Sequence, residues 1–322
     1  MLIKAERLHA IDVFTGRRLW ETEFPWRHNA GDQLVALEDA IYVTGGTTCL
    51  VLDPATGRKS GQIELPAGLK GAWANLRAWQ GYLVAQSGLE LVCLNRRGGE
   101  LVWKHHCGRP PLSVAVGGKK VCCAELGKKP PEGTSGQDPL SYAFDIETGK
   151  LLWQAPSDGE VRYSAALDVV VTSTGIHRAA DGTLVARLPE PPKLTALTKP
   201  VNIPKPLLVV GPHVLFGTAE NLALYDLSTG QRTGAPIVWT RRGCTVPRAS
   251  ANLITTRVRG NAACIDLVSR DILTFWNVRA ACSNNLFPAD GVLNVPSLTG
   301  GCTCNYTPVS QAFVPASAFA RP

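Results

Sequence analysis

Ten cysteines are the side chains whose spacing could support chemistry most directly. Five lie from Cys244 onward, and four of them form the group considered first: Cys244, Cys282, Cys302 and Cys304. Such a group can form two disulfides or a thiolate metal site. The Cys-x-Cys spacing at the end is tighter than that of zinc sites, and no histidine lies nearby. We therefore expect no metal, and disulfides that join Cys244 or Cys282 to Cys302 or Cys304.

The same region is rich in arginine and asparagine. Guanidinium groups bind carboxylates, and also the polar edges of sugars. The alternative is that these side chains bond the exposed backbone at strand ends. The ligand-binding candidates are Arg241, Arg248, Asn252, Arg279 and Asn285.

Several other kinds of site have no sequence signal. The six histidines show no ligand spacing, and there is no haem motif, phosphate-binding glycine loop or nucleophile elbow. The formal charge of +7 comes from scattered lysines and arginines without interleaved aromatic residues, so we expect no nucleic-acid partner. No run approaches the roughly 20 apolar residues of a membrane span.

The cysteines, arginines and asparagines described above are carried by a chain that is built from a repeated unit. Its best copy is 145–153, where an apolar strand runs into Asp145, a Thr148-Gly149 turn follows, and a second strand carries Trp153. Asp bonds the turn backbone and Gly supplies a positive φ, which predicts a β-hairpin. The Asp position recurs about every 40 residues, although Asn or Arg replaces Asp in two copies: 12, 53, 95, 145, 178, 226 and 266.

A strand-rich repeat of this length indicates propeller blades, each unable to bury both faces alone. We predict one all-β domain over 1–322, a β-propeller of four-stranded antiparallel blades. The count is eight, with seven as the alternative, and a closing segment covers about 281–322. The insertion 127–139 and the proline-rich connector 189–206 interrupt the pattern.

The start of the chain predicts an incomplete first blade. Met1 to Ala5 has the pattern of a second strand, and Leu8 to Asp12 that of a third. No signal peptide precedes them. We therefore expect an N-terminally truncated form of a longer protein. An even cysteine number favours an oxidising compartment for that parent.

The strand-Asp-x-x-Thr-Gly-x-x-x-Trp unit resembles the repeat of the quinoprotein-like (PQQ-like) β-propeller superfamily. That superfamily includes quinoprotein alcohol dehydrogenases and the outer-membrane assembly lipoprotein of the BAM complex. The block 241–306 also resembles the C-terminal signature of exported PQQ-like propellers of the planctomycete type. The resemblance implies a periplasmic or secreted parent, and it specifies fold far better than function.

Cys122 and Cys123 are the one pair that the resemblance connects with a cofactor. In quinoprotein alcohol dehydrogenases, adjacent cysteines form a ring on which PQQ stacks, and Glu125 is faintly similar to an acidic residue of that family. However, strand alternation puts the two side chains on opposite faces. The family's calcium-binding Glu and Asn and its catalytic Asp have no convincing counterparts. We predict two buried residues, with PQQ and Ca²⁺ as the alternative.

The sequence thus predicts a monomeric, exported propeller that binds a protein or carbohydrate and shows no demonstrable catalysis. The alternative is an enzyme that uses the axial pocket, either a PQQ-dependent dehydrogenase or a sugar-active enzyme. The remaining cysteines sit mostly in apolar strands and are predicted to belong to the core: Cys49, Cys93, Cys107 and Cys264.

Overall fold

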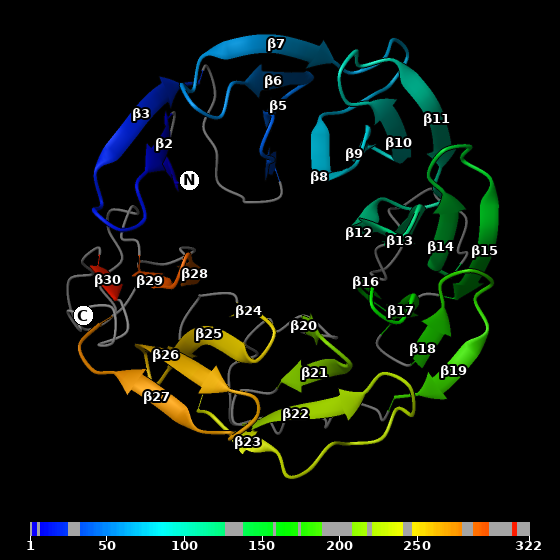
Figure 1. Cartoon of the computed structure of the whole chain (residues 1–322). Helices are drawn as coiled ribbons and strands as arrows, with labels where there is room; N and C mark the ends of the chain where they lie inside the picture. The colour runs from blue at the N-terminus through cyan, green and yellow to red at the C-terminus, as the bar shows by residue number, and fades with distance from the viewer. Residues whose placement is uncertain are drawn as a thin grey trace.

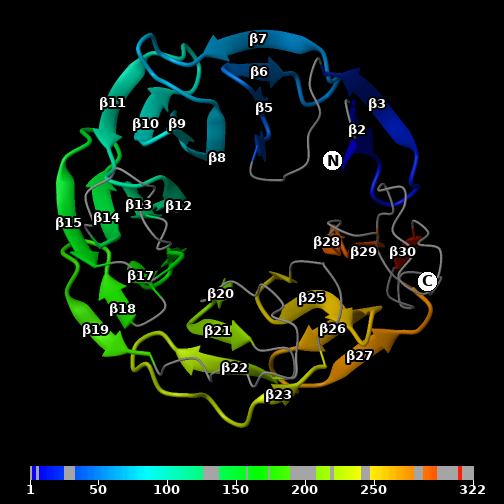
Figure 2. The same ribbon diagram turned by 180° about the vertical axis from the view of Figure 1, so that it is seen from behind.

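The strands form eight antiparallel sheets that stand around a common axis (Figures 1 and 2). Six sheets have four strands, and the first and last have three within the described residues. This confirms the all-β propeller and the count of eight, and the first blade has the predicted three strands. The computed structural model describes residues 2–4, 7–24, 33–125, 138–156, 159–172, 175–188, 208–217, 221–240, 247–278, 286–295 and 311–313.

Strand bounds in the first half of the ring follow the repeat closely. We number the blades one to eight in chain order. Blades one to four contain β1 (Leu2–Lys4), β2 (Arg7–Ile11) and β3 (Arg18–Glu23); β4 (Leu34–Ala36), β5 (Ile41–Gly45), β6 (Thr48–Leu52) and β7 (Lys59–Glu64); β8 (Trp73–Trp79), β9 (Tyr82–Ser87), β10 (Glu90–Asn95) and β11 (Leu101–His106); β12 (Pro111–Gly117), β13 (Lys120–Glu125), β14 (Leu140–Asp145) and β15 (Leu151–Pro156).

The second half has shorter strands. Blades five to eight contain β16 (Arg162–Ser164), β17 (Val169–Val171), β18 (Gly175–Arg178) and β19 (Leu184–Arg187); β20 (Leu208–Val210), β21 (His213–Gly217), β22 (Asn221–Asp226) and β23 (Ile237–Val238); β24 (Arg248–Ala249), β25 (Leu253–Val258), β26 (Asn261–Asp266) and β27 (Ile272–Phe275); β28 (Phe287–Ala289), β29 (Val292–Val295) and β30 (Gln311–Phe313).

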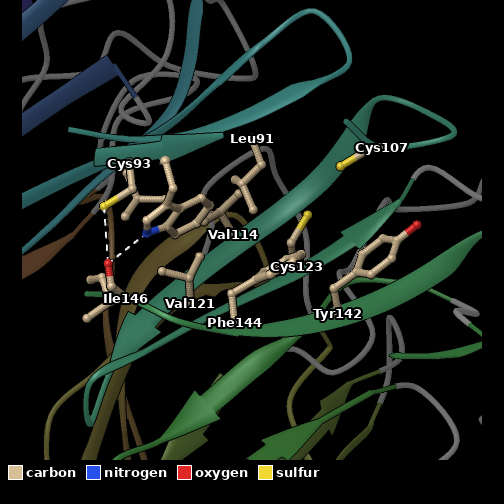
Figure 3. Packing of buried hydrophobic residues seen from close by; sticks show 11 residues of the cluster. Leu91, Cys93, Cys107, Val114, Val121, Cys123, Tyr142, Phe144 and Ile146 are labelled. Carbon is tan, nitrogen blue, oxygen red and sulfur yellow. Dashed lines mark hydrogen bonds between the residues drawn. The ribbon is translucent and has the colours of Figure 1, made fainter. Parts of the chain in front are cut away.

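The core lies between blades. Central strands are buried on both faces because a neighbouring blade covers each one, so β5 is buried at every position. Such strands are continuously apolar, without the alternation of a sheet that faces water. The outer strands do alternate, and β15 leaves most of its residues partly or fully exposed. Each apolar cluster therefore draws on more than one blade, such as the cluster of Leu91, Val114 and Phe144 (Figure 3).

The Asp-x-x-Thr-Gly segment forms the predicted turn between the third and fourth strands. One carboxylate oxygen of Asp145 accepts the Thr148 N–H at 2.8 Å and the Thr148 hydroxyl at 2.7 Å. These bonds lower the pKa of Asp145, the hydroxyl contributing most. Gly149 has the positive φ of 71° that the reversal requires. Asp12, Asp53 and Asp226 make the same contacts.

The tryptophan of the repeat, where it is present, packs on the turn of the next blade, as Trp20, Trp103 and Trp153 do. The indole N–H of Trp103 donates to the Ile146 carbonyl at 2.7 Å (Figure 3). That of Trp153 donates to the Ala179 carbonyl at 3.0 Å. A Cβ built on Gly149 would lie 2.5 Å from Cγ of Trp103. The Trp and the Gly of the motif are therefore the two halves of one contact between blades.

A candidate binding face at one end of the ring

The two ends of the ring are built from different connections. In an up-and-down blade, the first-to-second and third-to-fourth turns share one end, which we call the turn end. The Ile146 N–H donates to the Lys119 carbonyl there at 3.0 Å. The second-to-third turns and the links to the next blade share the opposite end, the connection end. The Trp73 N–H donates to the Gly46 carbonyl there at 2.9 Å.

The longest segments between strands start and finish at the connection end, and the ten-residue connection 227–236 between β22 and β23 is the longest at the turn end. The other connections at the turn end are short turns, such as Gln80-Gly81 between β8 and β9. The predicted insertion and the proline-rich connector both join strand ends at the connection end. The largest insertions relative to the repeat thus fall at one end. The longer segments between these strand ends lie outside the described residues: 25–32, 126–137, 189–207, 241–246, 279–285 and 296–310.

Two of the predicted ligand-binding residues fall within the described ranges. Arg248 begins β24, the short inner strand of blade seven, and is exposed (Figure 1). Asn252 is exposed in the turn that follows at the turn end, where its carbonyl accepts the Leu267 N–H at 2.8 Å. The remaining predicted site residues lie outside the described residues: Arg241, Arg279, Asn285, Cys244, Cys282, Cys302 and Cys304.

Inner strands carry two further arginines that the sequence analysis did not select. Nε of Arg77 donates to the Val114 carbonyl of the next blade at 3.1 Å. Nη1 of Arg162 donates to the Val161 carbonyl at 3.0 Å, and its other terminal nitrogen pairs with Glu160. Both guanidinium groups thus bond backbone at inner strands. This is the structural role that was the alternative for the predicted arginines.

Arg257 is different, because one of its nitrogens has no partner. Only 3% of this residue is exposed, and its Nε donates to the Gly260 carbonyl at 3.2 Å. Its Nη1 is buried without a hydrogen bond. Arg257 lies two residues after Thr255, whose hydroxyl donates to the Leu286 carbonyl of blade eight at 2.9 Å. A buried guanidinium nitrogen without a partner is costly, and a carboxylate would satisfy it.

Sequence reasoning missed Arg257, although a signal exists. The strand Leu253–Val258 is otherwise uncharged, and Arg257 is the charged residue in a run whose last five positions are all buried. A charge in a strand that neighbouring blades cover on both sides marks either a buried network or a ligand contact.

Glu125 organises the connection end of blade four. Its side chain is buried, with 2% of the residue exposed. One carboxylate oxygen accepts the N–H groups of Gly108 and Arg109 at 2.7 and 3.2 Å and the Tyr142 hydroxyl at 2.9 Å. The other accepts the Leu140 N–H at 2.8 Å. The carboxylate therefore ties the link from blade three to both ends of the insertion.

Cys122 and Cys123 point to opposite faces of β13, as strand alternation predicts. Cys122 packs toward blade five with Trp153, and Cys123 packs toward blade three with Trp103. Both are fully buried, and burial raises the pKa of the Cys122 thiol to about 12. A ring between adjacent cysteines needs both sulfurs on one side. These two residues therefore do not fit a PQQ site.

The described residues contain no group of three or more His, Cys, Asp and Glu side chains that could hold a metal ion. The six cysteines in these ranges are all thiols. No helix in the described part of the chain is long and apolar enough to cross a membrane.

Eight blades, four of them with Asp-x-x-Thr-Gly turns and three with an indole hydrogen bond to the next blade, define a β-propeller of the PQQ-like repeat class. The sequence matches the family of the outer membrane protein assembly factor BamB over residues 4–122 and 90–277. The chain belongs to this family. No curated protein matches it.

Solved structures share the fold at low sequence identity. BamB from Moraxella catarrhalis is 15% identical with a TM-score of 0.56, and the match covers 92% of this chain and 88% of that one. A europium-containing methanol dehydrogenase is 11% identical with a TM-score of 0.60, over 90% and 77%. The computationally designed Ika8 protein is 13% identical with a TM-score of 0.51, over 82% and 92%. These likenesses show the fold alone.

Proposed function

We propose that this protein is an exported scaffold that binds a protein partner through the connection end of its ring. The observation that carries the proposal is the segregation of connections. Short turns predominate at one end, and the longest segments between strands attach at the other. Binding residues concentrate on loops that a rigid framework positions. The matched family is named for an assembly factor of outer membrane proteins, which fits both a protein partner and export.

Arg257 and Arg248 indicate the chemistry of the partner. Arg248 is exposed on an inner strand, and Arg257 holds a buried nitrogen without a partner beside blade eight. Guanidinium groups pair with carboxylates in a fixed geometry. The partner segment therefore carries Asp or Glu side chains, or a free C-terminus. The PQQ-dependent dehydrogenase is not favoured, because Cys122 and Cys123 do not fit that cofactor.

Two exposed alanines of blade two allow a matched test. Ala67 lies in the link from β7 to β8 at the connection end, and Ala55 lies in the Asp53 turn at the turn end. A photo-crosslinking amino acid replaces each alanine in turn, and the chain is irradiated in its source cells. We expect a discrete protein adduct from position 67 and none from position 55. The proposal fails if the two positions give equal adducts, or if neither gives one.

The crosslinking experiment, together with a glycan array, distinguishes two other kinds of partner. An adduct between position 67 and a second copy of this chain would show that the connection end forms a dimer interface, contrary to the predicted monomer. Binding of the purified chain to a glycan array, without a protein adduct, would make the partner a carbohydrate.

A further inference from the structure

Two buried cysteines from neighbouring blades face each other. Cys107 follows β11 at the end of blade three, where its N–H donates to the Leu89 carbonyl at 2.9 Å. Cys123 lies in the middle of β13 in blade four, paired with Val114 and Tyr142. Neither has any exposed surface, and both belong to the same apolar cluster. Figure 3 shows their sulfur atoms directed toward one another.

The contact is specific to this pair of thiols. The neighbouring Cys107 thiol, together with burial, raises the pKa of Cys123. Cys93 belongs to the same cluster, but its thiol donates to the Ile146 carbonyl at 3.6 Å. Among the other cysteines in the described ranges, Cys49 and Cys122 lie in separate clusters.

We infer that Cys107 and Cys123 form a disulfide that covalently joins the third and fourth blades. Two S–H bonds break and one S–S bond forms, with release of two protons and two electrons. The oxidant is a protein or small-molecule disulfide, which accepts the electrons and is reduced to two thiols. The inference goes beyond the proposed function, because the reaction depends on the two thiols and on no partner.

The burial of the pair determines when the reaction takes place. A thiol attacks a disulfide as its thiolate, and a buried thiol with a raised pKa supplies little thiolate. Exchange therefore precedes the packing of blade three on blade four, and the finished bond is protected from reductants. The bond would hold the link after β11, whose Gly108 N–H donates to Glu125. It would also exclude Cys123 from any pairing with Cys122.

Peptide mapping tests the bond directly in the full chain. The unfolded protein is refolded in a mixture of reduced and oxidised glutathione, alkylated, and digested with trypsin without reduction. Trypsin places Cys107 in the peptide 105–119 and both cysteines of β13 in 121–128. We expect these two peptides to be joined, and to separate on reduction.

Variants assign the sulfur and control for folding. C122A should keep the joined peptides and C123A should lose them, while C93A should leave the bond unchanged. A reductant should lower the urea concentration at the unfolding midpoint more for C93A than for C93A/C107A. The first variant keeps the proposed disulfide, and the second cannot form it. Separate peptides in the refolded wild-type chain, or a bond through Cys122, would overturn the inference. This result does not depend on the adducts of positions 55 and 67.

Discussion

At the scale of single residues, Glu125 shows how a buried charge can be structural. Its carboxylate accepts four hydrogen bonds, three of them from backbone N–H groups. Those groups belong to the link after β11 and to the start of β14. Bonds to a charged acceptor are stronger than neutral ones, and removal of the charge leaves buried donors unsatisfied. The carboxylate therefore fixes the end of β13 and the start of β14, the two strand ends that the insertion 127–139 joins.

The substitution E125Q tests this role. An amide would place a donor against donors, so we expect a loss of about 2 kcal/mol in the free energy of unfolding, measured in urea. E147Q is the matched control, because Glu147 is an exposed carboxylate that pairs with Lys119. We expect the control to stay within about 0.5 kcal/mol of wild type. Equal effects of the two changes would contradict the anchoring role.

The turn carboxylates predict acid sensitivity. The hydroxyl of Thr148 lowers the pKa of Asp145 below its usual 3.8, the hydroxyl of Thr56 lowers the pKa of Asp53, and the hydroxyl of Ser228 lowers that of Asp226. A carboxyl group whose pKa is lower in the folded state stabilises the fold above the unfolded value. That contribution is lost as the pH falls through the folded value. We therefore expect the melting temperature of the protein to decrease when the pH is lowered below about 4.

Blade three supplies the control for this pH dependence, because it has Asn95 at the Asp position. The Asn95 side chain accepts the Arg97 N–H at 2.9 Å without a titrating group. D145N should make the loss of melting temperature in acid less steep, and N95D should make it steeper. Identical acid profiles for the two variants would contradict the assignment.

At the scale of elements, the outer strands of blades one, three and four are fixed by the turn of the next blade. Trp103 lies against Gly149, and Trp153 lies against Gly182. Both indoles also donate to a backbone carbonyl of that neighbouring turn. One residue type thus supplies buried area and a directed hydrogen bond, which explains why Trp suits this position.

A comparison of two glycines in the same type of turn distinguishes the energy of the contact with Trp from the cost of backbone strain. Gly16 and Gly149 have φ values of 69° and 71°, but a Cβ on Gly16 would meet nothing within 4 Å. G16A should cost about 1 kcal/mol, the strain of a left-handed residue. G149A also forces a methyl group against Trp103 and should cost about 3 kcal/mol. Urea unfolding measures both, and equal costs would disprove the contact.

At the scale of the molecule, the packing between blades is uneven around the ring. A large apolar cluster joins blades three and four, and a small one joins blades seven and eight. The first and last blades show three strands each in the part of the chain that the structure describes. Local opening free energies follow buried contacts. The ring should therefore open first at blades one and eight.

Hydrogen exchange of backbone amides measures this order. We expect strong protection in β10 and β13, in the middle of the ring. Faster exchange is expected in β2 and β29, which occupy equivalent central positions in blades one and eight. Uniform protection of these four strands would show that the closing blades are as stable as the rest.

Some features of the fold and of the candidate site could be predicted from the sequence, and others could not. The turn at Asp145 and the strand after it are encoded within a few residues, so the blades and their order were predictable. The closing segment was predicted as about 281–322, and its described strands are β28, β29 and β30. Glu125 and Cys107 gain their roles from partners 15 or more residues away. Their roles depend on how blades pack, which no local pattern reports.

The pairing of each Trp with the Gly of the following turn also bears on how such a ring arises. One unit carries the Trp of its own outer strand and the Gly that receives the Trp before it. A duplicated unit inserted in tandem therefore brings both surfaces of a junction, and its neighbours need no compensating change. Gene duplication can lengthen the ring one blade at a time. Substitutions that remove the Trp, as at Gly61 and Gly234, can then accumulate at single junctions.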